Sequence, residues 1–287
     1  MDKLSILISS FNRPDLIGLS IESILSSNIP EGLDLEIVVV DDQSNDETWE
    51  ILKRYNDDPR FIIYRNPNKT GSGGPNWSKG FELSSGNIVT NNEDDMIWHK
   101  DYIRELYQTL KKHDKYTCVF GMYIQSSSLD DLHPPRTQPT NPSPNFGLLT
   151  KIPHKYTDGK GEHVAHNEFF CYREFFDGLD ELWHDFPGSG MREETDLYLR
   201  TLKLDPPRKY ITNPRAYLWH VHSTSGKYIW GLKKRRRIVK DNHKIFLKRN
   251  YGKMAYIYLF FTRLYIIQKW IRDMIGHHII EPLTKNR

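Results

Sequence analysis

The chain has 287 residues, 38% of them hydrophobic and 13% aromatic, enough to bury the core of one large domain with appendages. Its only cysteines, Cys118 and Cys171, exclude a disulfide framework and a cysteine-rich metal site, and they fit a reducing, cytoplasmic setting. The net charge of +3 is uneven: residues 227–287 hold 16 Lys/Arg and 3 Asp/Glu, a balance of +13. Residues 1–226 therefore hold 24 and 34, a balance of −10.

The first 125 residues alternate short apolar runs with segments of helical spacing. The runs predict strands at Leu4–Ser9, Glu36–Val40, Phe61–Tyr64, Asn87–Thr90 and Thr117–Tyr123. The helical spacing predicts helices at Asp15–Leu25, from Asn45 or Asp46 to about Arg54, Trp77–Leu83 and Lys100–Lys112. Strands separated by helices predict βαβ units, and therefore an α/β fold with a largely parallel sheet. The first strand follows Met1 without the longer apolar region of a signal peptide, so we expect no secretory leader.

The regular pattern stops between Ser126 and Gly161, where six prolines occur, and returns from Glu168 to Leu204. A segment of this length without regular pattern is too long for a simple connection. Two interpretations stay open: a lid or specificity loop, and a disordered excursion.

Two polar segments follow predicted elements of the sheet. Glu36–Thr48 (EIVVVDDQSNDET) ends a strand in two carboxylates, which can hydrogen-bond a nucleobase and ribose or simply lead into a capped helix. Asn66–Gly80 (NPNKTGSGGPNWSKG) has three glycines in four positions, which allow close backbone approach to a ligand or make a flexible loop. The second segment is neither a P-loop nor GxGxxG.

Two acidic clusters lie about a hundred residues apart. Glu93-Asp94-Asp95 follows a predicted strand, where carboxylates are suited to hold a divalent cation against phosphate. The second cluster, Glu193-Glu194-Thr195-Asp196, opens an amphipathic stretch and offers a carboxylate as general base. Since ligands of open parallel sheets bind at the carboxyl ends of the strands, where Asp41-Asp42 and Asp94-Asp95 fall, the pattern predicts an enzyme site at that edge.

Six motifs in order resemble family 2 glycosyltransferases with the GT-A fold, over roughly residues 3–226. They are Ser5–Pro14 (SILISSFNRP), Val38–Thr48 (VVVDDQSNDET), the glycine-rich Asn68–Gly80, Glu93-Asp94-Asp95 at the DxD element, Arg192–Arg200 (REETDLYLR) and Pro214–Gly226 (PRAYLWHVHSTSG). The resemblance implies a GT-A domain over 1–226, with a nucleotide-binding half at about 1–125 and an acceptor-side half at about 126–226. A basic helical tail would follow over 227–287.

The resemblance also implies roles for the donor-binding residues. The nucleotide-sugar set would be Ser9, Asp41, Asp42, Gly73, Gly74, Glu93 and Asp94. Ser9 and Asp42 would contact the nucleobase with Asp41 close by, and Glu93 and Asp94 would lie near the sugar and ribose. The donor would be a nucleoside diphosphate sugar, with uridine favoured by family habit.

The resemblance also implies which residues bind the metal and which residue is the catalytic base. Asp95 would bind Mn²⁺ or Mg²⁺, with His220 helping to hold the metal or the diphosphate and His222 as its alternative. Glu194 would be the base, and Asp196 is the second candidate. The implied reaction is a single displacement onto a hydroxyl of a glycan, lipid-linked or cell-surface polysaccharide precursor, which inverts the anomeric configuration.

Two other classes of function stay open at this point. A sugar-phosphate nucleotidyltransferase would carry a glycine-rich loop containing Arg or Lys after the first strand, where this chain has Ser9–Pro14 (SSFNRP). A non-catalytic membrane or nucleic-acid adaptor would not need the intact acidic motifs. Release of nucleoside diphosphate, of pyrophosphate, or of neither separates the three.

The basic tail has three possible partners. It contains the run Lys233–Arg237, while charged residues interrupt the apolar stretch Met254–Ile280, so no uncharged run is long enough to span a bilayer. Basic helices with aromatic residues suit an anionic lipid surface, which would place the protein peripherally on the inner face of the membrane. The alternatives are packing on the catalytic domain or on a second subunit, and, least favoured, a nucleic-acid patch.

Overall fold

The computed structural model describes residues 1–126, 128–132, 155–156, 168–183, 186, 193–221 and 232–252. Most of the proline-rich segment, His222 and residues 253–287 lie outside these ranges, as do the side chains of Lys233–Arg236. In the described ranges, the strands are β1 (Asp2–Ser10), β2 (Leu33–Asp41), β3 (Phe61–Arg65), β4 (Ile88–Glu93), β5 (Met96–Trp98), β6 (Thr117–Ser126), β7 (Lys155–Tyr156), β8 (Phe169–Tyr172) and β9 (Lys209–Val221). The helices are α1 (Ile17–Leu25), α2 (Thr48–Lys53), α3 (Gly73–Leu83), α4 (Tyr102–Leu110), α5 (Glu193–Thr201) and α6 (Leu232–Tyr251).

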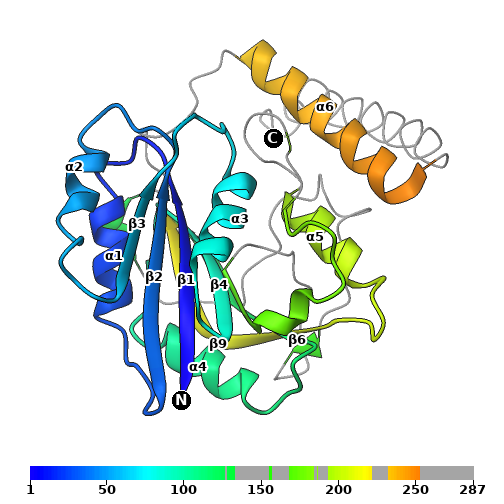
Figure 1. Ribbon diagram of the computed structural model, residues 1–287, viewed down its shortest axis with the longest axis horizontal. Coiled ribbons are helices and arrows are strands. Elements are labelled where there is room, and N and C mark those ends of the chain that lie inside the picture. Colours follow the sequence, from blue (N-terminus) through cyan, green and yellow to red (C-terminus); the bar gives the residue numbers. More distant parts are fainter. Residues whose placement is uncertain are drawn as a thin grey trace, which may run out of the picture.

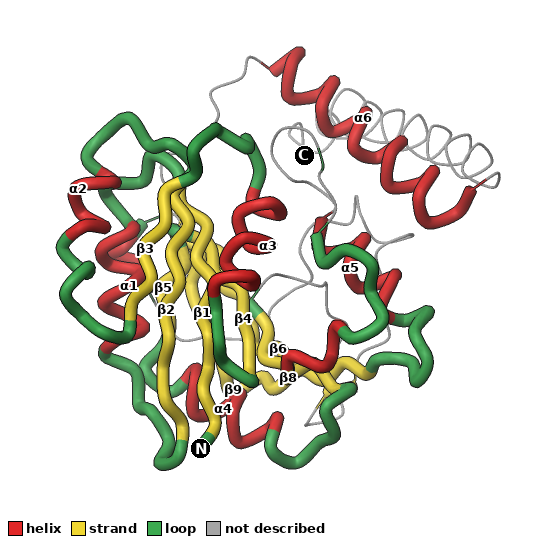
Figure 2. The backbone as a smooth tube through the Cα atoms, viewed as in Figure 1, coloured by secondary structure: helices red, strands yellow, loops and turns green. Residues whose placement is uncertain are grey.

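The strands form one mixed sheet in the order β3-β2-β1-β4-β8-β6-β9-β5, with β7 paired to β9 (Figures 1 and 2). The half that contains β1 to β4 is parallel, since β1 pairs in parallel with β2 and β4, and β2 with β3. The other half is mixed, because β8 runs antiparallel to both β4 and β6. The α/β fold is confirmed, and the five strands and four helices predicted in the first 125 residues are all present; β5 is a further strand that the sequence did not predict.

Helices cover both faces of the sheet, and the alternation of side chains along β1 shows why. Leu4, Ile6 and Ile8 point to one face, where they pack with residues of α1, α2 and α4. Leu7 points to the other face, into an aromatic core that includes Trp77 of α3 and residues of α5. In Figure 1, α1 and α2 accordingly lie on one side of the strands and α3 and α5 on the other. Strands buried on both faces need continuous apolar runs, which is the pattern of β1 and β2.

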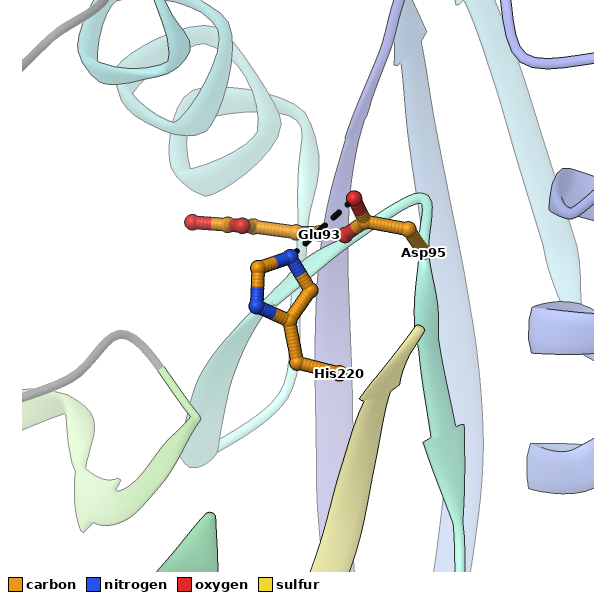
Figure 3. A group of neighbouring side chains, drawn as sticks. All are labelled: Glu93, Asp95 and His220. Atoms are coloured by element: carbon orange, nitrogen blue, oxygen red, sulfur yellow. Dashed lines mark hydrogen bonds and ion pairs between the residues drawn. The ribbon is translucent and has the colours of Figure 1, made fainter. Parts of the chain in front are cut away.

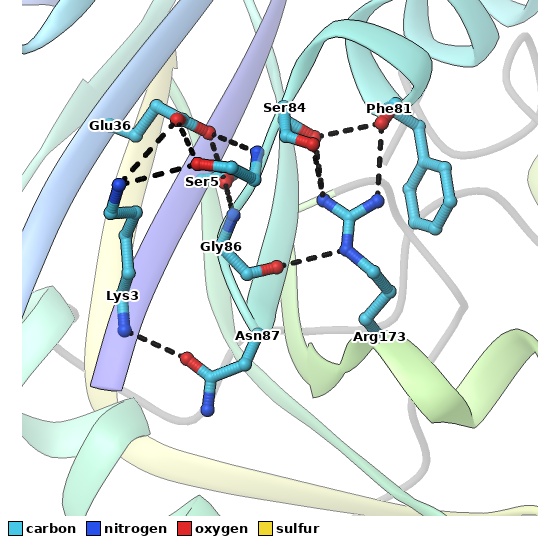
Figure 4. Close-up of polar contacts among 9 residues, drawn as sticks. Lys3, Ser5, Glu36, Phe81, Ser84, Gly86, Asn87 and Arg173 are labelled. Carbon is cyan, nitrogen blue, oxygen red and sulfur yellow. Dashed lines mark hydrogen bonds and ion pairs between the residues drawn. The ribbon is translucent and has the colours of Figure 1, made fainter. Parts of the chain in front are cut away.

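A network of polar contacts lies at the end of the sheet where β1 begins (Figure 4). The buried carboxylate of Glu36 accepts hydrogen bonds from Ser5 Oγ at 2.6 Å and from Ser85 N at 2.7 Å. Beside it, the Arg173 guanidinium donates to the carbonyl oxygens of Gly86 and Phe81 and stacks on the Phe81 ring, 4.1 Å from its centroid. Both side chains hold the loop between α3 and β4, and so fix the start of the strand that leads into the first acidic cluster.

Replacing Glu36 with glutamine is expected to lower the free energy of unfolding by about 2 kcal/mol at pH 7, because the hydroxyl and N–H donors lose a charged acceptor. Burial tends to raise the pKa of Glu36, but the hydrogen bonds from Ser5 and Ser85 outweigh burial and lower it. This stabilisation is therefore present above the unfolded-state pKa and is lost as the pH falls through the folded-state pKa.

Urea denaturation of wild type and Glu36→Gln at pH 7 and at acidic pH measures this difference, which should shrink on acidification. The matched control is Glu82→Gln, whose exposed side chain pairs with Lys79 one helical turn away, and which should change stability little at either pH. A difference between wild type and Glu36→Gln that grows on acidification would contradict the assigned direction.

Candidate active site

The carboxyl ends of the parallel strands bring the polar motifs to one edge of the sheet. Ser9 of β1 lies opposite Val40 of β2 on one side and Glu93 of β4 on the other. Ser10 lies opposite Asp41. The residues after β1, β2 and β4 are therefore neighbours, as the sequence pattern predicts for a parallel sheet.

Three potential metal ligands meet where β4 turns into β5 (Figure 3). One ligand atom each from Glu93, Asp95 and His220 lies within 4.8 Å of the other two. The antiparallel pairing of β5 with β9 places Met96 opposite His220, so the histidine reaches the turn from a strand more than a hundred residues away in sequence. The predicted metal residues, Asp95 and His220, thus lie together, and Glu93 joins them.

Asp95 and His220 form an ion pair. His220 Nε2 lies 3.2 Å from Asp95 Oδ2, and the Tyr123 hydroxyl contacts the other ring nitrogen. Burial alone would raise the pKa of Asp95 and lower that of His220, but each shifts the other way because of this hydrogen bond and the opposite charge. The pair therefore favours a carboxylate beside an imidazolium when no other cation is present.

The environment of Glu93 is different. Burial raises the pKa of Glu93 to about 8, and the nearby charges of Glu168 and Asp95 act in the same direction. Glu168, which is 1% exposed just before β8, has a pKa that burial likewise raises to about 8. Sequence reasoning missed Glu168, because it lies between an irregular segment and a short strand and only the β4–β8–β6 pairing brings it near the first acidic cluster.

The residues present suit a divalent cation. Asp95 Oδ1 is buried and, within the part of the chain that the structure describes, has no hydrogen-bond partner. Two carboxylates and an imidazole are oxygen and nitrogen donors of the kind that Mn²⁺ accepts, and carboxylates also suit Mg²⁺. A cation would lower the cost of keeping Glu93 and Asp95 charged side by side, so the cluster fits a metal site.

Arg13 is a site residue that the sequence did not single out. Its guanidinium lies 3.1 Å from an oxygen of Asp94 and 3.1 Å from an oxygen of Asp95. Asp94 also accepts a hydrogen bond from the Phe11 N–H at 3.0 Å. Burial raises the pKa of Asp94 to about 6 even though the charge of Arg13 lowers it. The turn after β1 therefore holds Asp94 and Asp95, and Arg13 contacts the same Asp95 oxygen, Oδ2, as His220 does.

The two carboxylates at the end of β2, Asp41 and Asp42, are buried and accept hydrogen bonds. Asp42 accepts hydrogen bonds from Thr70 N at 2.7 Å and Gly71 N at 2.9 Å, which ties the glycine-rich segment to the end of β2. Asp41, which is 0% exposed, accepts from Ser44 N and pairs with Arg65 at 3.3 Å. Burial raises the pKa of Asp41 despite these partners. Both side chains order the loops that surround the carboxyl edge.

Ser9 belongs to the same loop network. Its hydroxyl accepts a hydrogen bond from Asn76 Nδ2 at 2.9 Å, and Asn76 Oδ1 in turn accepts from Asn66 Nδ2 at 2.7 Å. Asn66 also donates to Asp42 at 3.1 Å. The predicted residues Ser9 and Asp42 are thus linked through two asparagines.

The glycines predicted to approach the donor open α3. Gly73 and Gly74 form its first turn, and α3 lies beside β1 and β4 (Figure 1). A Cβ atom on Gly73 would lie 2.9 Å from the ring of Trp77, and one on Gly74 would lie 3.1 Å from Cδ of Glu193. At both positions the missing side chain makes room for a side chain of the protein itself.

The structure separates the two base candidates. Glu194, in the first turn of α5, is partly exposed, and its charge contributes to the raised pKa of Glu93. Asp196 is 0% exposed, and its two oxygens accept hydrogen bonds from Arg200 at 3.0 Å and from Asn250 of α6 at 2.7 Å. The charge of Glu194 is therefore near enough to act on Glu93, while Asp196 connects α5 to α6.

Comparisons with known proteins identify the family of the chain. Residues 5–179 match the family model described as glycosyl transferase family 2. The chain is similar to a GalNAc(5)-diNAcBac-PP-undecaprenol beta-1,3-glucosyltransferase of Campylobacter jejuni, with 36% identity over 123 residues, 42% of this chain and 38% of that protein. It is also similar to the UDP-Glc:alpha-D-GlcNAc-diphosphoundecaprenol beta-1,3-glucosyltransferase WfaP of Escherichia coli, with 30% identity over 34% of this chain and 37% of that one. The chain thus matches less than half the length of these two relatives.

Solved structures share the fold at low sequence identity. S. aureus TarS 1-349 in complex with UDP-GlcNAc has a TM-score of 0.60 and 14% identity, over 89% of this chain and 69% of that one. Glucosyl-3-phosphoglycerate synthase from Mycobacterium tuberculosis, solved with Mn²⁺, UDP and phosphoglyceric acid, has a TM-score of 0.56 and 16% identity, over 87% and 79%. The fold is therefore of the GT-A type, and the chain belongs to glycosyl transferase family 2.

Proposed function

We propose that this protein is an inverting glycosyltransferase that moves a sugar from a nucleoside diphosphate sugar to an acceptor hydroxyl. The observation that supports this most is the cluster of Glu93, Asp95 and His220 at the carboxyl edge of the sheet, with Glu194 on the same side. The family match argues against the nucleotidyltransferase and adaptor alternatives. We propose residues 1–226 as the catalytic domain, with 1–125 and 126–226 as its donor and acceptor halves and 227–287 as its tail.

For the donor we propose a UDP-sugar, bound over the loops after β1 and β2. Ser9, Asp41 and Asp42 would border the nucleobase and ribose, and Asp42 would act by ordering the loop of Thr70 and Gly71. The first turn of α3, at Gly73 and Gly74, would lie beside the phosphates, with the Gly73 N–H turned toward them, while the Gly74 N–H lies near the Glu193 carboxyl group. Uridine is supported by the UDP and UDP-GlcNAc in structures of the same fold.

For the metal we propose Mn²⁺ or Mg²⁺ held by Asp95, Glu93 and His220. When bound, the cation would neutralise the diphosphate leaving group. Arg13 would keep Asp94 and Asp95 turned toward the site, since it pairs with both. His220 would give up its ion pair with Asp95 and act as a neutral imidazole ligand.

For the base we propose Glu194. Its carboxylate would take the proton of the acceptor hydroxyl while that oxygen bonds to the anomeric carbon and the bond to the diphosphate breaks. Attack from the face opposite the diphosphate inverts the anomeric configuration. Asp196 is the weaker candidate, because both its oxygens are already hydrogen-bonded and its side chain is buried.

The acceptor we propose is a sugar hydroxyl of a lipid-linked glycan. The two curated relatives are named for diphosphoundecaprenol-linked sugars. The test is an assay with a panel of UDP-sugars, Mn²⁺ and sugar–diphosphate–polyprenol acceptors, which should release UDP in step with a lengthened acceptor. Release of pyrophosphate would favour nucleotidyl transfer, and no turnover of any pair would contradict the proposal.

For the tail we propose that α6 does two things at once. One face packs against α5, through the buried side chains of Phe246 and Leu247 near Leu199, and through the hydrogen bond from Asn250 to Asp196. The basic side chains on its other positions are exposed: Arg237, Lys240, Lys244, Lys248 and Arg249. None of the described helices is long and apolar enough to cross a membrane. We infer that the basic residues meet anionic lipid and keep the protein peripherally on the cytoplasmic membrane face.

This assignment favours lipid over the other partners of the tail. A homo-oligomer built on the apolar face of α6 would displace its contacts with α5. Nucleic acid is disfavoured because the relatives act, by name, on lipid-linked sugars. Removal of everything after Gly226 should therefore destabilise the catalytic domain, since it uncovers part of α5.

Replacing Lys240, Lys244 and Lys248 together with alanine is expected to weaken binding to anionic vesicles by about 100-fold at low salt, since each lysine contributes about 1 kcal/mol. The fold should persist, because all three side chains are exposed. Sedimentation with phosphatidylglycerol vesicles at two salt concentrations measures it. The matched control replaces the exposed Lys53, Lys100 and Lys112, and equal losses in both triple variants would contradict a specific role for α6.

A further inference from the structure

Glu193, the residue before the proposed base, packs against the start of α3. Glu193 is buried, with only 2% of its surface exposed. A Cβ atom on Gly74 would lie 3.1 Å from Cδ and 3.2 Å from Oε1 of Glu193, and 3.2 Å from Cβ of Trp183. The carboxyl group thus rests almost directly on the Cα atom of Gly74, and any larger residue there would push it away.

The contact needs space at Gly74 and no unusual backbone. Gly74 lies inside a regular helical turn, whereas Gly71, three residues earlier, has a φ of +83° and needs glycine for its conformation. Alanine suits a helix better than glycine does. The glycine at position 74 is therefore explained by the side chain that approaches it.

The groups at this contact are polar on both sides. Ser72, the N-cap residue of α3, makes no capping hydrogen bond with its side chain. Ser72 Oγ and Glu193 Oε1 are buried and lack a partner of standard geometry among the described residues. Burial, followed by the charge of Glu194, raises the pKa of Glu193, while the Ser72 hydroxyl and the Gly74 N–H lie near enough to oppose that rise. A carboxyl group at a helix N-terminus is favourable.

We propose that Glu193 is a positioning residue that fixes α5 against Gly74, and thereby holds Glu194 in place beside the metal cluster. The proposal rests on the proposed role of Glu194 as base. Glu194 is the next residue of the same helix, so a contact that fixes the backbone of α5 at Glu193 also fixes the position from which the Glu194 side chain extends. The same contact joins the donor loops, which lead into α3, to the helix of the base.

The competing explanation is that Gly74 lets the donor approach the backbone. The two explanations differ in what Gly74→Ala changes. If the donor needs the space, alanine weakens UDP binding whatever residue stands at 193. If Glu193 needs the space, alanine displaces Glu193 by a few tenths of an ångström, and a shorter side chain at 193 relieves the crowding.

The experiment compares Gly74→Ala, Glu193→Asp and the double variant, measuring kcat, KM for the donor and the UDP dissociation constant with Mn²⁺. We expect Gly74→Ala to lower kcat by on the order of tenfold through misplacement of Glu194, with UDP affinity within about twofold of wild type. The double variant should recover part of that loss. A tenfold or greater loss of UDP affinity in Gly74→Ala, or a double variant at least as impaired as the product of the single effects, would overturn the proposal.

A second measurement does not depend on activity. Thermal unfolding of the same variants should show coupling, with the double variant melting above the temperature expected from the two single shifts. The control is Gly18→Ala, where the nearest atom to a new Cβ is Ile51 Cγ2 at 3.7 Å, and which should show no coupling to Glu193→Asp. Coupling in a protein that transfers no sugar would contradict the proposed function but support the contact between Glu193 and Gly74. Additive shifts would contradict the contact itself.

Discussion

Glu194→Gln is expected to lower kcat by about 10²- to 10⁴-fold, the range of general base catalysis, while the affinity for UDP stays near that of wild type. The amide keeps the size of the side chain and loses the ability to take a proton. Since Glu194 is partly exposed at the start of α5, the substitution should leave the fold intact. Steady-state kinetics, together with calorimetric titration of UDP, measures both quantities.

The matched variant is Asp196→Asn, two residues further along the same helix. Asp196 bonds to Arg200 and Asn250 inside the protein, so its loss should mainly lower the free energy of unfolding, by about 2 kcal/mol. The reverse outcome would make Asp196 the base: a stable Asp196→Asn without turnover, beside a Glu194→Gln that still turns over.

Asp95→Asn is expected to abolish Mn²⁺-dependent UDP binding, a loss of at least about 10²-fold, because a carboxylate ligand is replaced by a neutral amide. Asp95 pairs with both His220 and Arg13. The pKa of His220 should fall in this variant, since its partner charge is gone. Titration of UDP with and without Mn²⁺ checks the expectation.

The control for this variant is Asp34→Asn, an exposed aspartate at the opposite end of β2, which should bind UDP as wild type does. Unfolding in the presence of a chelator should separate a lost ligand from a lost fold. If Asp95→Asn binds UDP with an unchanged dependence on Mn²⁺, Asp95 has no place in the metal site.

The sequence was sufficient to predict the parallel half of the fold, and physical reasons explain why. Val38, Val39 and Val40 lie in a continuous β-branched run, which is typical of a strand buried on both faces. Once the strands are parallel, their carboxyl ends meet, so Asp42 and Asp95 fall on one edge without further information. By contrast, β5 has three residues, too few for a periodic signal, and both β5 and β8 pair antiparallel with their neighbours.

The site was predictable where it follows strand ends and not where it depends on distant contacts. Arg13 stands in a turn and gives no signal that its partners lie 81 and 82 residues further along. Helix geometry alone predicts that only one of Glu194 and Asp196 faces the site, because residues two apart on a helix do not face the same side. It does not say which of the two that is. The contact of Glu193 with Gly74 joins two segments over a hundred residues apart, and no local pattern encodes it.

The measurement that tests the central claim most directly is the anomeric configuration of the product. The donor is a UDP-sugar whose sugar is α-linked to the diphosphate, and it is incubated with wild-type protein, Mn²⁺ and a lipid-linked acceptor. Proton NMR of the anomeric signals follows the reaction. The account predicts a β-linked product, formed with UDP and absent with Glu194→Gln. An α-linked product, or an equal yield of β-linked product from Glu194→Gln, would contradict single displacement with Glu194 as the base.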